Sequence, residues 1–196
     1  MSEPHRRVFS LAEFLDWEEA QDRRFELIDG QAVMMAGGTQ GHALIAANIV
    51  SSLRTSLRGG PCRPVGSDLR VPITTTGNSR YPDVTIDCGR FDPKAHDASE
   101  PTVVFEVLSD STGWYDQTRK LRDYDGVPTI RQYVCVSQSE PRLLVWRRDD
   151  EGRLVPDAVI VDGMIELELP GSVIRLPLTD IYEGTGLRAP PTARPT

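Results

Sequence analysis

A carboxylate stands in the middle of an otherwise apolar stretch of the sequence. Residues 102–108 read TVVFEVL, in which Glu106 is the single ionisable side chain. Burying an unpaired carboxylate costs several kcal/mol, so Glu106 needs a partner if this stretch is a core strand. The partner could be an arginine, a metal ion or water at the end of the strand. An arginine pair would be structural, whereas a metal ion held by carboxylates would imply chemistry.

Two further carboxylates lie near the ends of predicted strands. Asp83 directly follows Pro82 and opens the segment DVTID. Because proline lacks an N–H and restricts the local backbone, this order presents the carboxylate at the start of a strand. Glu26 lies in RFELIDG, where alternation places it on the face opposite the apolar residues beside it. Taken singly, Asp83 also fits a solvated strand end, and Glu26 also fits an exposed edge position.

Lys120 belongs to the rarer kind of cation in this chain, which has twenty arginines but only the lysines Lys94 and Lys120. A lysine supplies a compact point charge instead of a planar guanidinium fork, so its use favours a position that needs such a charge. Asp116, Lys120 and Tyr124 follow one another at helical spacing, and an ordinary Asp–Lys pair explains the lysine as well. His42 lies outside any HxxxH or HExxH pattern, and we interpret it as a structural histidine.

The surrounding pattern predicts the elements that would position these residues. A capping box at Ser10 and Glu13 precedes a helix, the pair Asp29-Gly30 predicts a hairpin, and apolar residues at helical spacing predict a second helix over 39–58. CRPVGS, DLRVPI, YPDVTIDC and TVVFEVLS are predicted strands, with TTTGNSR as a loop between the second and the third. STGWYDQTRKLRDYDG is a predicted helix, and IRQYVCVS, RLLVWRR and several short strands follow it. This order indicates an α/β (α+β) domain around a central sheet, with parallel pairing expected across the second and third helices.

The composition excludes several classes of protein. The 196 residues carry a net charge of −7, which disfavours non-specific binding to phosphate backbones. Residues 149–196 account for −5 of this charge, so the remainder is close to neutral and a nucleic-acid partner stays possible. No phosphate-binding GxGxxG or GxxxxGKS motif and no GxSxG elbow occurs, so neither a nucleotide fold nor acyl transfer without a metal is indicated.

Localisation and cysteine chemistry follow from simple patterns. No apolar run is long enough to cross a bilayer, and the N-terminal residues lack a secretory apolar region. We therefore expect a cytoplasmic protein without a membrane partner. Cys62, Cys88 and Cys135 are odd in number, widely spaced and without a CxxC pair. We expect neither a disulfide framework nor a zinc site from them.

Taken in order along the chain, several segments resemble a known family. FELIDG, SDLRVP, YPDVTI, VFEVLSDST and YDQTRKLRDYDGVPTIRQYVCV follow the order of the Uma-type family of predicted restriction endonucleases, within the PD-(D/E)xK nuclease superfamily. The similarity runs from about residue 10 to residue 148. It implies a restriction endonuclease-like fold, a central mixed sheet flanked by helices with an αβββαβ core. We expect this domain over 10–148, a C-terminal β extension of it over 149–187 and a disordered tail over 188–196.

The resemblance also implies roles for individual residues. Asp83 matches the aspartate of the PD element, and Glu106 matches the second acidic position. The superfamily lysine would stand two residues later, where this chain has Leu108. The family resemblance places that lysine on the following helix, at Lys120. Glu26 matches the glutamate of the family's first strand.

These residue types suit the chemistry that the superfamily performs. Mg²⁺, or Mn²⁺ as a substitute, prefers oxygen ligands, which Asp83 and Glu106 would supply together with the backbone carbonyl of Val107. The metal polarises the phosphate and lowers the pKa of bound water. Lys120 would orient that water and stabilise charge in the transition state.

The sequence thus predicts a Mg²⁺-dependent endonuclease that hydrolyses DNA, with a homodimer expected by resemblance. The alternative is a catalytically inactive binding or scaffold protein with a nuclease fold, which the displaced lysine and the acidic charge would favour. A substrate of RNA or of branched nucleic acid is also compatible with these residues.

Overall fold

The computed structural model describes residues 7–108 and 114–187. Its elements follow one another as α1 (Leu11–Glu18), β1 (Phe25–Ile28), β2 (Gln31–Met34), α2 (Gln40–Ser56), β3 (Arg63–Gly66), β4 (Val71–Ile73), β5 (Asn78–Arg80), β6 (Val84–Asp87), β7 (Pro101–Leu108), α3 (Trp114–Asp125), β8 (Gln132–Ser137), β9 (Leu143–Arg148), β10 (Leu154–Ile160), β11 (Met164–Leu169), β12 (Ser172–Pro177) and α4 (Leu178–Ile181). The mixed α/β class predicted from the sequence is confirmed.

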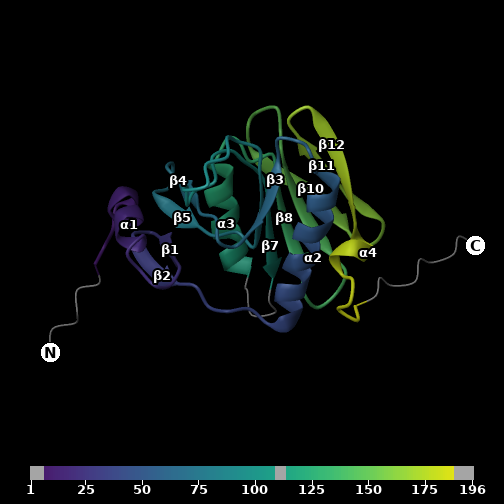
Figure 1. Cartoon of the computed structure of the whole chain (residues 1–196), viewed down its shortest axis with the longest axis horizontal. Coiled ribbons are helices and arrows are strands. Elements are labelled where there is room, and N and C mark those ends of the chain that lie inside the picture. Colours follow the sequence, from purple (N-terminus) through teal and green to yellow (C-terminus); the bar gives the residue numbers. More distant parts are fainter. Residues whose placement is uncertain (1–6, 109–113, 188–196) are drawn as a thin grey trace, which may run out of the picture.

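A six-stranded mixed sheet forms the body of the molecule, in the order β10-β9-β8-β7-β6-β3 (Figure 1). β7 and β8 run parallel across α3, whereas the other neighbours are antiparallel. The elements α2, β3, β6, β7, α3 and β8 make up the expected αβββαβ core, with the β4–β5 hairpin inserted before β6. The parallel pair across the third helix is therefore confirmed. The pair expected across α2 is wrong, because β2 and β3 belong to different sheets.

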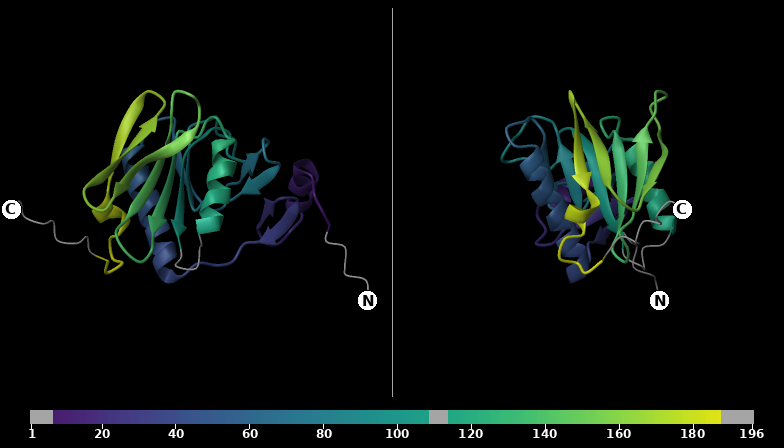
Figure 2. Two further views of the ribbon diagram at one scale, coloured as in Figure 1. Left: turned by 180° about the vertical axis from the view of Figure 1, so that it is seen from behind. Right: turned by 90° about the vertical axis from the view of Figure 1, so that its right-hand side faces the viewer.

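The two faces of this sheet carry separate cores under different helices. Alternation along β7 sends Val103, Phe105 and Val107 to the core that contains the buried face of α2. Val104 belongs instead to the core on the side of α3. Figure 2 shows the two helices on opposite faces of the sheet. Glu106 shares the strand parity of Val104, so its carboxylate is directed toward α3.

The N-terminal residues form a smaller unit beside the body (Figure 1). The capping box at Ser10 and Glu13 is present, and the hairpin turn at Asp29-Gly30 has φ angles of 48° and 77°, as a type I′ turn requires. Phe9, Phe14 and Leu27 give this unit a third apolar cluster of its own. We call α1, β1 and β2 the N-terminal unit.

The prediction of a loop over 74–80 is wrong at its end. Asn78, Ser79 and Arg80 form the buried strand β5, which pairs with β1 and β4. Their polar side chains hid the strand from an analysis of apolar periodicity. Asn78 and Arg80 are accommodated because the carboxylate of Asp123 accepts a hydrogen bond from each side chain.

The C-terminal strands extend the structure in two ways. β9 and β10 continue the main sheet, and the β11–β12 hairpin packs with the short helix α4 on the face covered by α2. The sequence did not predict α4. The tail over 188–196, predicted to be disordered, lies outside the described residues. No helix in the described ranges is long and apolar enough to cross a membrane.

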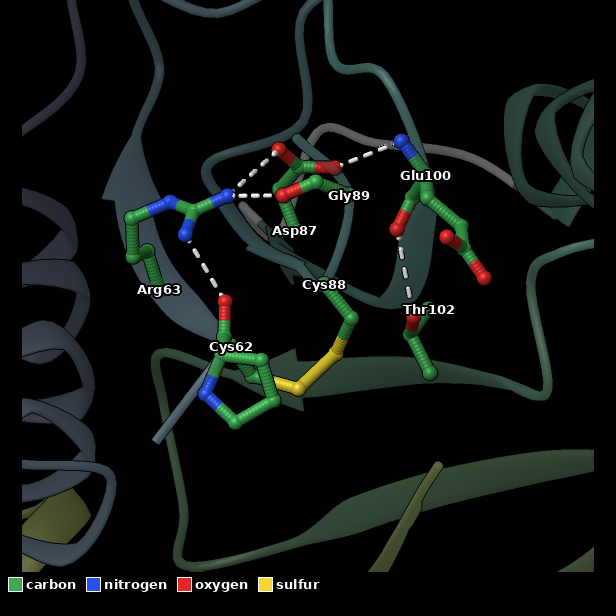
Figure 3. Close-up of a disulfide and its surroundings, with 8 residues drawn as sticks. Cys62, Arg63, Asp87, Cys88, Gly89, Glu100 and Thr102 are labelled. Atoms are coloured by element: carbon green, nitrogen blue, oxygen red, sulfur yellow. Dashed lines mark hydrogen bonds and ion pairs between the residues drawn. A yellow bond between two sulfur atoms is a disulfide. The ribbon is translucent and has the colours of Figure 1, made fainter. Parts of the chain in front are cut away.

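The cysteine prediction is wrong, because Cys62 and Cys88 form a disulfide (Figure 3). The two residues are 26 positions apart in the sequence. The antiparallel pairing of Arg63 with Asp87 places the residue before Arg63 opposite the residue after Asp87, and these two residues are Cys62 and Cys88. Sequence spacing could not show this proximity, which depends on the strand register. Such bonds are rare in the cytosol, where thiols are kept reduced, so the cytoplasmic localisation stays a prediction.

Candidate functional site

A cavity of about 1170 Å³ lies between the β1–β2 hairpin, α2 and the adjoining ends of β6 and β7. The cavity is lined by every residue assigned to the site from the sequence, namely Glu26, Asp83, Glu106, Val107 and Lys120. His42, which was not assigned to the site, lines it as well. These residues come from five different elements or their ends. The fold therefore brings together the positions that the sequence could only place in order.

Asp83 lies directly before β6 and is held from two sides. Its Oδ1 atom is 2.9 Å from His42 Nε2, and its Oδ2 atom accepts a hydrogen bond of 2.7 Å from the backbone N–H of Val107. The side chain is 15% exposed, so it still borders the cavity. The solvated strand end considered as an alternative is excluded by these contacts. They fix the orientation of a carboxylate that faces the open space.

Glu106 is almost completely buried, at 3% exposure, and both of its carboxylate oxygens accept hydrogen bonds from α3. Lys120 Nζ donates to Oε2 over 2.8 Å, and the Tyr124 hydroxyl donates to Oε1 over 2.5 Å. Lys120 and Tyr124 are four residues apart, so they lie on the same helix face. The partner that the buried carboxylate needs is thus a lysine and a tyrosine.

The electrostatics of this region are unbalanced toward negative charge. Burial is the main cause that raises the pKa of Glu106 to about 7, and the charges of Asp83 and Glu26 raise it further against the opposing effect of Lys120. The pKa of His42 is raised chiefly by its hydrogen bond to Asp83. The local field therefore favours an additional positive charge or a proton.

Glu26 is engaged differently from the other two carboxylates. Its Oε2 atom accepts a hydrogen bond of 2.9 Å from the buried guanidinium of Arg80, and its Oε1 atom accepts one of 3.2 Å from the backbone N–H of Tyr81. The exposed edge position considered for it is excluded, since the side chain is 14% exposed. Glu26 borders the cavity but is already paired with an arginine.

Two residues that contact the carboxylates of the site were not assigned to it from the sequence. His42 was interpreted as structural, and its ring contacts Asp83. Its position depends on Gly38, because a Cβ atom there would lie 2.8 Å from the imidazole Cγ. Tyr124 shared the helical spacing of Lys120, and that spacing was the available signal. The Asp116 side chain, which was the alternative partner for Lys120, lies outside the described side chains.

The side chains of the cavity supply only some of the ligands that a hard divalent cation needs. Within the described ranges, no three His, Cys, Asp or Glu side chains are close enough together to hold a metal ion. Asp83 and Glu106 offer carboxylates beside the Val107 carbonyl, and Mg²⁺ commonly binds one or two carboxylates plus water and substrate phosphate. Burial is the largest cause of the raised pKa of Glu106, and the charges of Asp83 and Glu26 add to it, so a cation there would offset that negative charge. The residues present therefore fit a Mg²⁺ site completed by solvent and substrate.

Comparisons with known proteins show the family to which the chain belongs. The sequence model of the Uma2 family, described as "Putative restriction endonuclease", matches residues 11–177. An uncharacterized protein of Synechocystis sp., slr1290, is 36% identical over 144 residues, which cover 73% of this chain and 76% of the relative. A second Synechocystis protein, the uncharacterized sll1609, is 27% identical over 67% of this chain and 76% of its own length.

A solved structure supports the fold independently. The crystal structure of "a putative nuclease belonging to DUF820" from Anabaena variabilis superposes with a TM-score of 0.70 and covers 89% of this chain and 97% of its own. Its sequence identity of 17% makes this a likeness of fold. The family match extends through most of the described chain, including every residue of the cavity named above. The chain therefore belongs to the Uma2 family, and its fold is that of restriction endonuclease-like nucleases.

Proposed function

We propose that this protein is a metal-dependent endonuclease that hydrolyses phosphodiester bonds of DNA at the cavity. The observation that carries the proposal is the joint presence of Asp83, Glu106 and Lys120 around one open space. Family membership supports a nuclease, and the donor set supports Mg²⁺, with Mn²⁺ as a substitute. A bound cation would polarise the phosphate and lower the pKa of its water.

The chain's own residues would each perform one task. Asp83, Glu106 and the carbonyl of Val107 would hold the cation. Lys120 now binds Glu106 at 2.8 Å. With the charge of Glu106 engaged by the cation, the ammonium group of Lys120 would be available to the phosphate oxygens or the attacking water. The position of Lys120 on α3 supports the displacement inferred from Leu108, since the lysine reaches Glu106 from the helix.

His42 would act as a positioning residue for Asp83. Its Nε2 atom and the Val107 N–H hold one oxygen each, at 2.9 Å and 2.7 Å. Together they restrict rotation of the carboxylate, which a cation site requires if its ligands are to be preorganised. Replacement by glutamine keeps an amide donor near the Nε2 position, and replacement by alanine does not. We expect H42Q to retain most of the Mg²⁺ affinity that H42A loses.

The test is cleavage of plasmid and oligonucleotide DNA with Mg²⁺ or Mn²⁺, alongside calorimetry of metal binding. We expect D83N and E106Q to lose metal binding, and K120M to keep it while losing activity by at least a hundredfold. Lys94→Met is the matched control for Lys120→Met, because Lys94 is an exposed lysine away from the cavity.

The result decides between the two functions considered. If D83N and E106Q cleave as well as the wild type, the proposed site is wrong. If the wild type binds neither cation and cleaves nothing, the protein is a nuclease-fold binding or scaffold protein, as the engaged state of Lys120 would then explain. The expected homodimer stays a prediction, which sedimentation velocity would test.

A further inference from the structure

We propose that the cavity takes an unpaired DNA strand, with one phosphate at Asp83, Glu106 and Lys120 and the neighbouring bases against an apolar wall on β2. This inference rests on the proposed function and specifies the form of its substrate. We define the β2 wall as Val33 and Met35, which have the same strand parity and both line the cavity.

The β2 wall is apolar and open although it borders a charged site. Val33 is 44% exposed on a strand at the edge of its sheet, and Met35 is half-buried directly after that strand. Val33 is the cross-strand partner of Glu26, so the wall begins beside the Glu26 carboxylate. Across the cavity, α2 contributes further apolar contact through Ala43 and Val50. Adjoining apolar side chains exposed at a site indicate a ligand with apolar surface.

The faces of unpaired bases are such a surface. In a duplex these faces are stacked on one another, and the outside presents phosphates and sugars. In a single strand each base offers a flat apolar face that packs on protein side chains. A phosphate and its own base belong to one nucleotide, and the two carboxylates and the β2 wall likewise line one cavity.

The charge of the cavity also favours a single strand over a duplex. Among its lining residues, the Lys and Arg side chains are Lys120 and Arg54, against three carboxylates. A protein that holds a duplex by its backbone commonly neutralises about six to ten phosphates. Two cations would neutralise at most about two, so the salt dependence of binding would be shallow. The choice of DNA over RNA follows from the proposed function, and the RNA probe below tests it.

The test is fluorescence anisotropy of labelled 15-nucleotide probes with the full chain in Ca²⁺ and in EDTA. The probes are a single-stranded DNA, its duplex and the RNA of the same sequence. We expect the DNA strand to bind at least tenfold more tightly than the duplex and more tightly than the RNA. The slope of log K against log salt should be no steeper than about −2.

Two matched double variants locate the contact. V33S/M35S removes the apolar side chains of the β2 wall and should weaken single-strand binding at least fivefold. V159S/V173S removes comparably exposed valines on β10 and β12, outside the cavity, and should leave binding unchanged. Circular dichroism and thermal unfolding would confirm that both variants fold.

The outcomes separate this inference from the proposed function. The inference is overturned if the duplex or the RNA binds as tightly as the DNA strand, if the salt slope is steeper than about −2, or if V33S/M35S binds like the wild type. Cleavage of duplex by a protein that does not bind the strand overturns the inference and leaves the nuclease intact. Tight binding of the strand without cleavage in any metal supports the cavity assignment and refutes the proposed function.

Discussion

Two clusters of buried charge occupy the same small molecule and differ in kind. The α1 cluster consists of Glu18, Arg70, Tyr81 and Asp97, and the cavity cluster consists of His42, Asp83, Glu106 and Lys120. In the first, one guanidinium that is 2% exposed donates to Glu18 and Asp97 at 3.0 and 2.6 Å. In the second, Lys120 donates to Glu106 and the His42 ring contacts Asp83 beside an open cavity. Burial of charge is common to both, so burial alone does not identify a site.

The type of cation distinguishes the two clusters. Arg70 is a planar fork whose donors are directed at fixed carboxylates, which suits a permanent brace. Lys120 carries a compact charge on a flexible stem, which suits an exchange of partners when a ligand arrives. The pKa of the Glu106 carboxylate is raised to about 7, chiefly by burial and further by the charges of Asp83 and Glu26. The cavity cluster therefore differs by its neighbouring carboxylates, its flexible cation and the adjoining open space.

The largest effect is expected from a substitution that breaks the α1 cluster. Arg70→Met leaves Glu18 buried beside the Tyr81 hydroxyl without its ion pair, and we expect the free energy of unfolding to fall by about 3–5 kcal/mol. Lys120→Met should cost less, since Glu106 can take up a proton close to neutral pH. Urea unfolding at pH 7 compares the two variants. Equal losses would mean that the two clusters are not different in kind.

The disulfide provides a covalent reference at the opposite end of β3 and β6. Because it closes a loop of 26 residues, its removal in C62A/C88A should lower the free energy of unfolding by about 3 kcal/mol. Metal binding at 25 °C should be unchanged, since the bond lies away from the cavity. A thiol assay under native conditions should detect little reaction, because the remaining Cys135 is buried and its pKa is raised to about 12. Rapid labelling of two further thiols would show that the bond is absent.

The pH dependence sharpens the comparison within the cavity cluster. The pKa of Glu106 is about 7 in the folded state against an ordinary value of 4.5, so between these values the folded protein binds more protons than the unfolded chain. The stability contributed by Glu106 should therefore decrease as pH rises from about 4.5 to 7, by up to about 3 kcal/mol. Urea unfolding of the wild type and of Glu106→Gln across this range isolates the effect. A constant difference between the two would refute the shift.

The smallest expected effect concerns the hydroxyl of Tyr124. Tyr124→Phe removes the donor to Glu106 Oε1 and keeps the ring that packs in the core. We expect the free energy of unfolding to fall by about 1 kcal/mol. We also expect the pKa of Glu106 to rise further, because a hydrogen bond to its charged form is lost. Carboxyl NMR of the labelled glutamate measures the second effect. A lowered pKa would show that the hydroxyl does not stabilise the charged form.

Local patterns in the sequence predicted the parts of the fold that depend on local physics. The capping box, the Asp29-Gly30 turn and the apolar strand around Glu106 each carry their signal within a few residues. β5 escaped prediction because its polar residues are satisfied by Asp123, more than forty positions away. The disulfide and the contact between His42 and Asp83 likewise depend on strand register and helix placement. Resemblance to a family placed Lys120 at the site, whereas helical spacing alone left it an ordinary surface pair.

The attachment of the N-terminal unit has a mechanical consequence. Its apolar cluster is closed within itself, and it joins the body through the pairing of β1 with β5 and through polar contacts, made by Arg80 to Glu26, Arg70 to Glu18 and the Asp29 N–H to Asn78. Rotation of this unit away from α2 would break that strand pairing and leave buried charges without partners. Because the ion pairs of Arg70 and Arg80 are buried, salt screens them little, so the width of the cavity should depend little on the ionic strength of the solution.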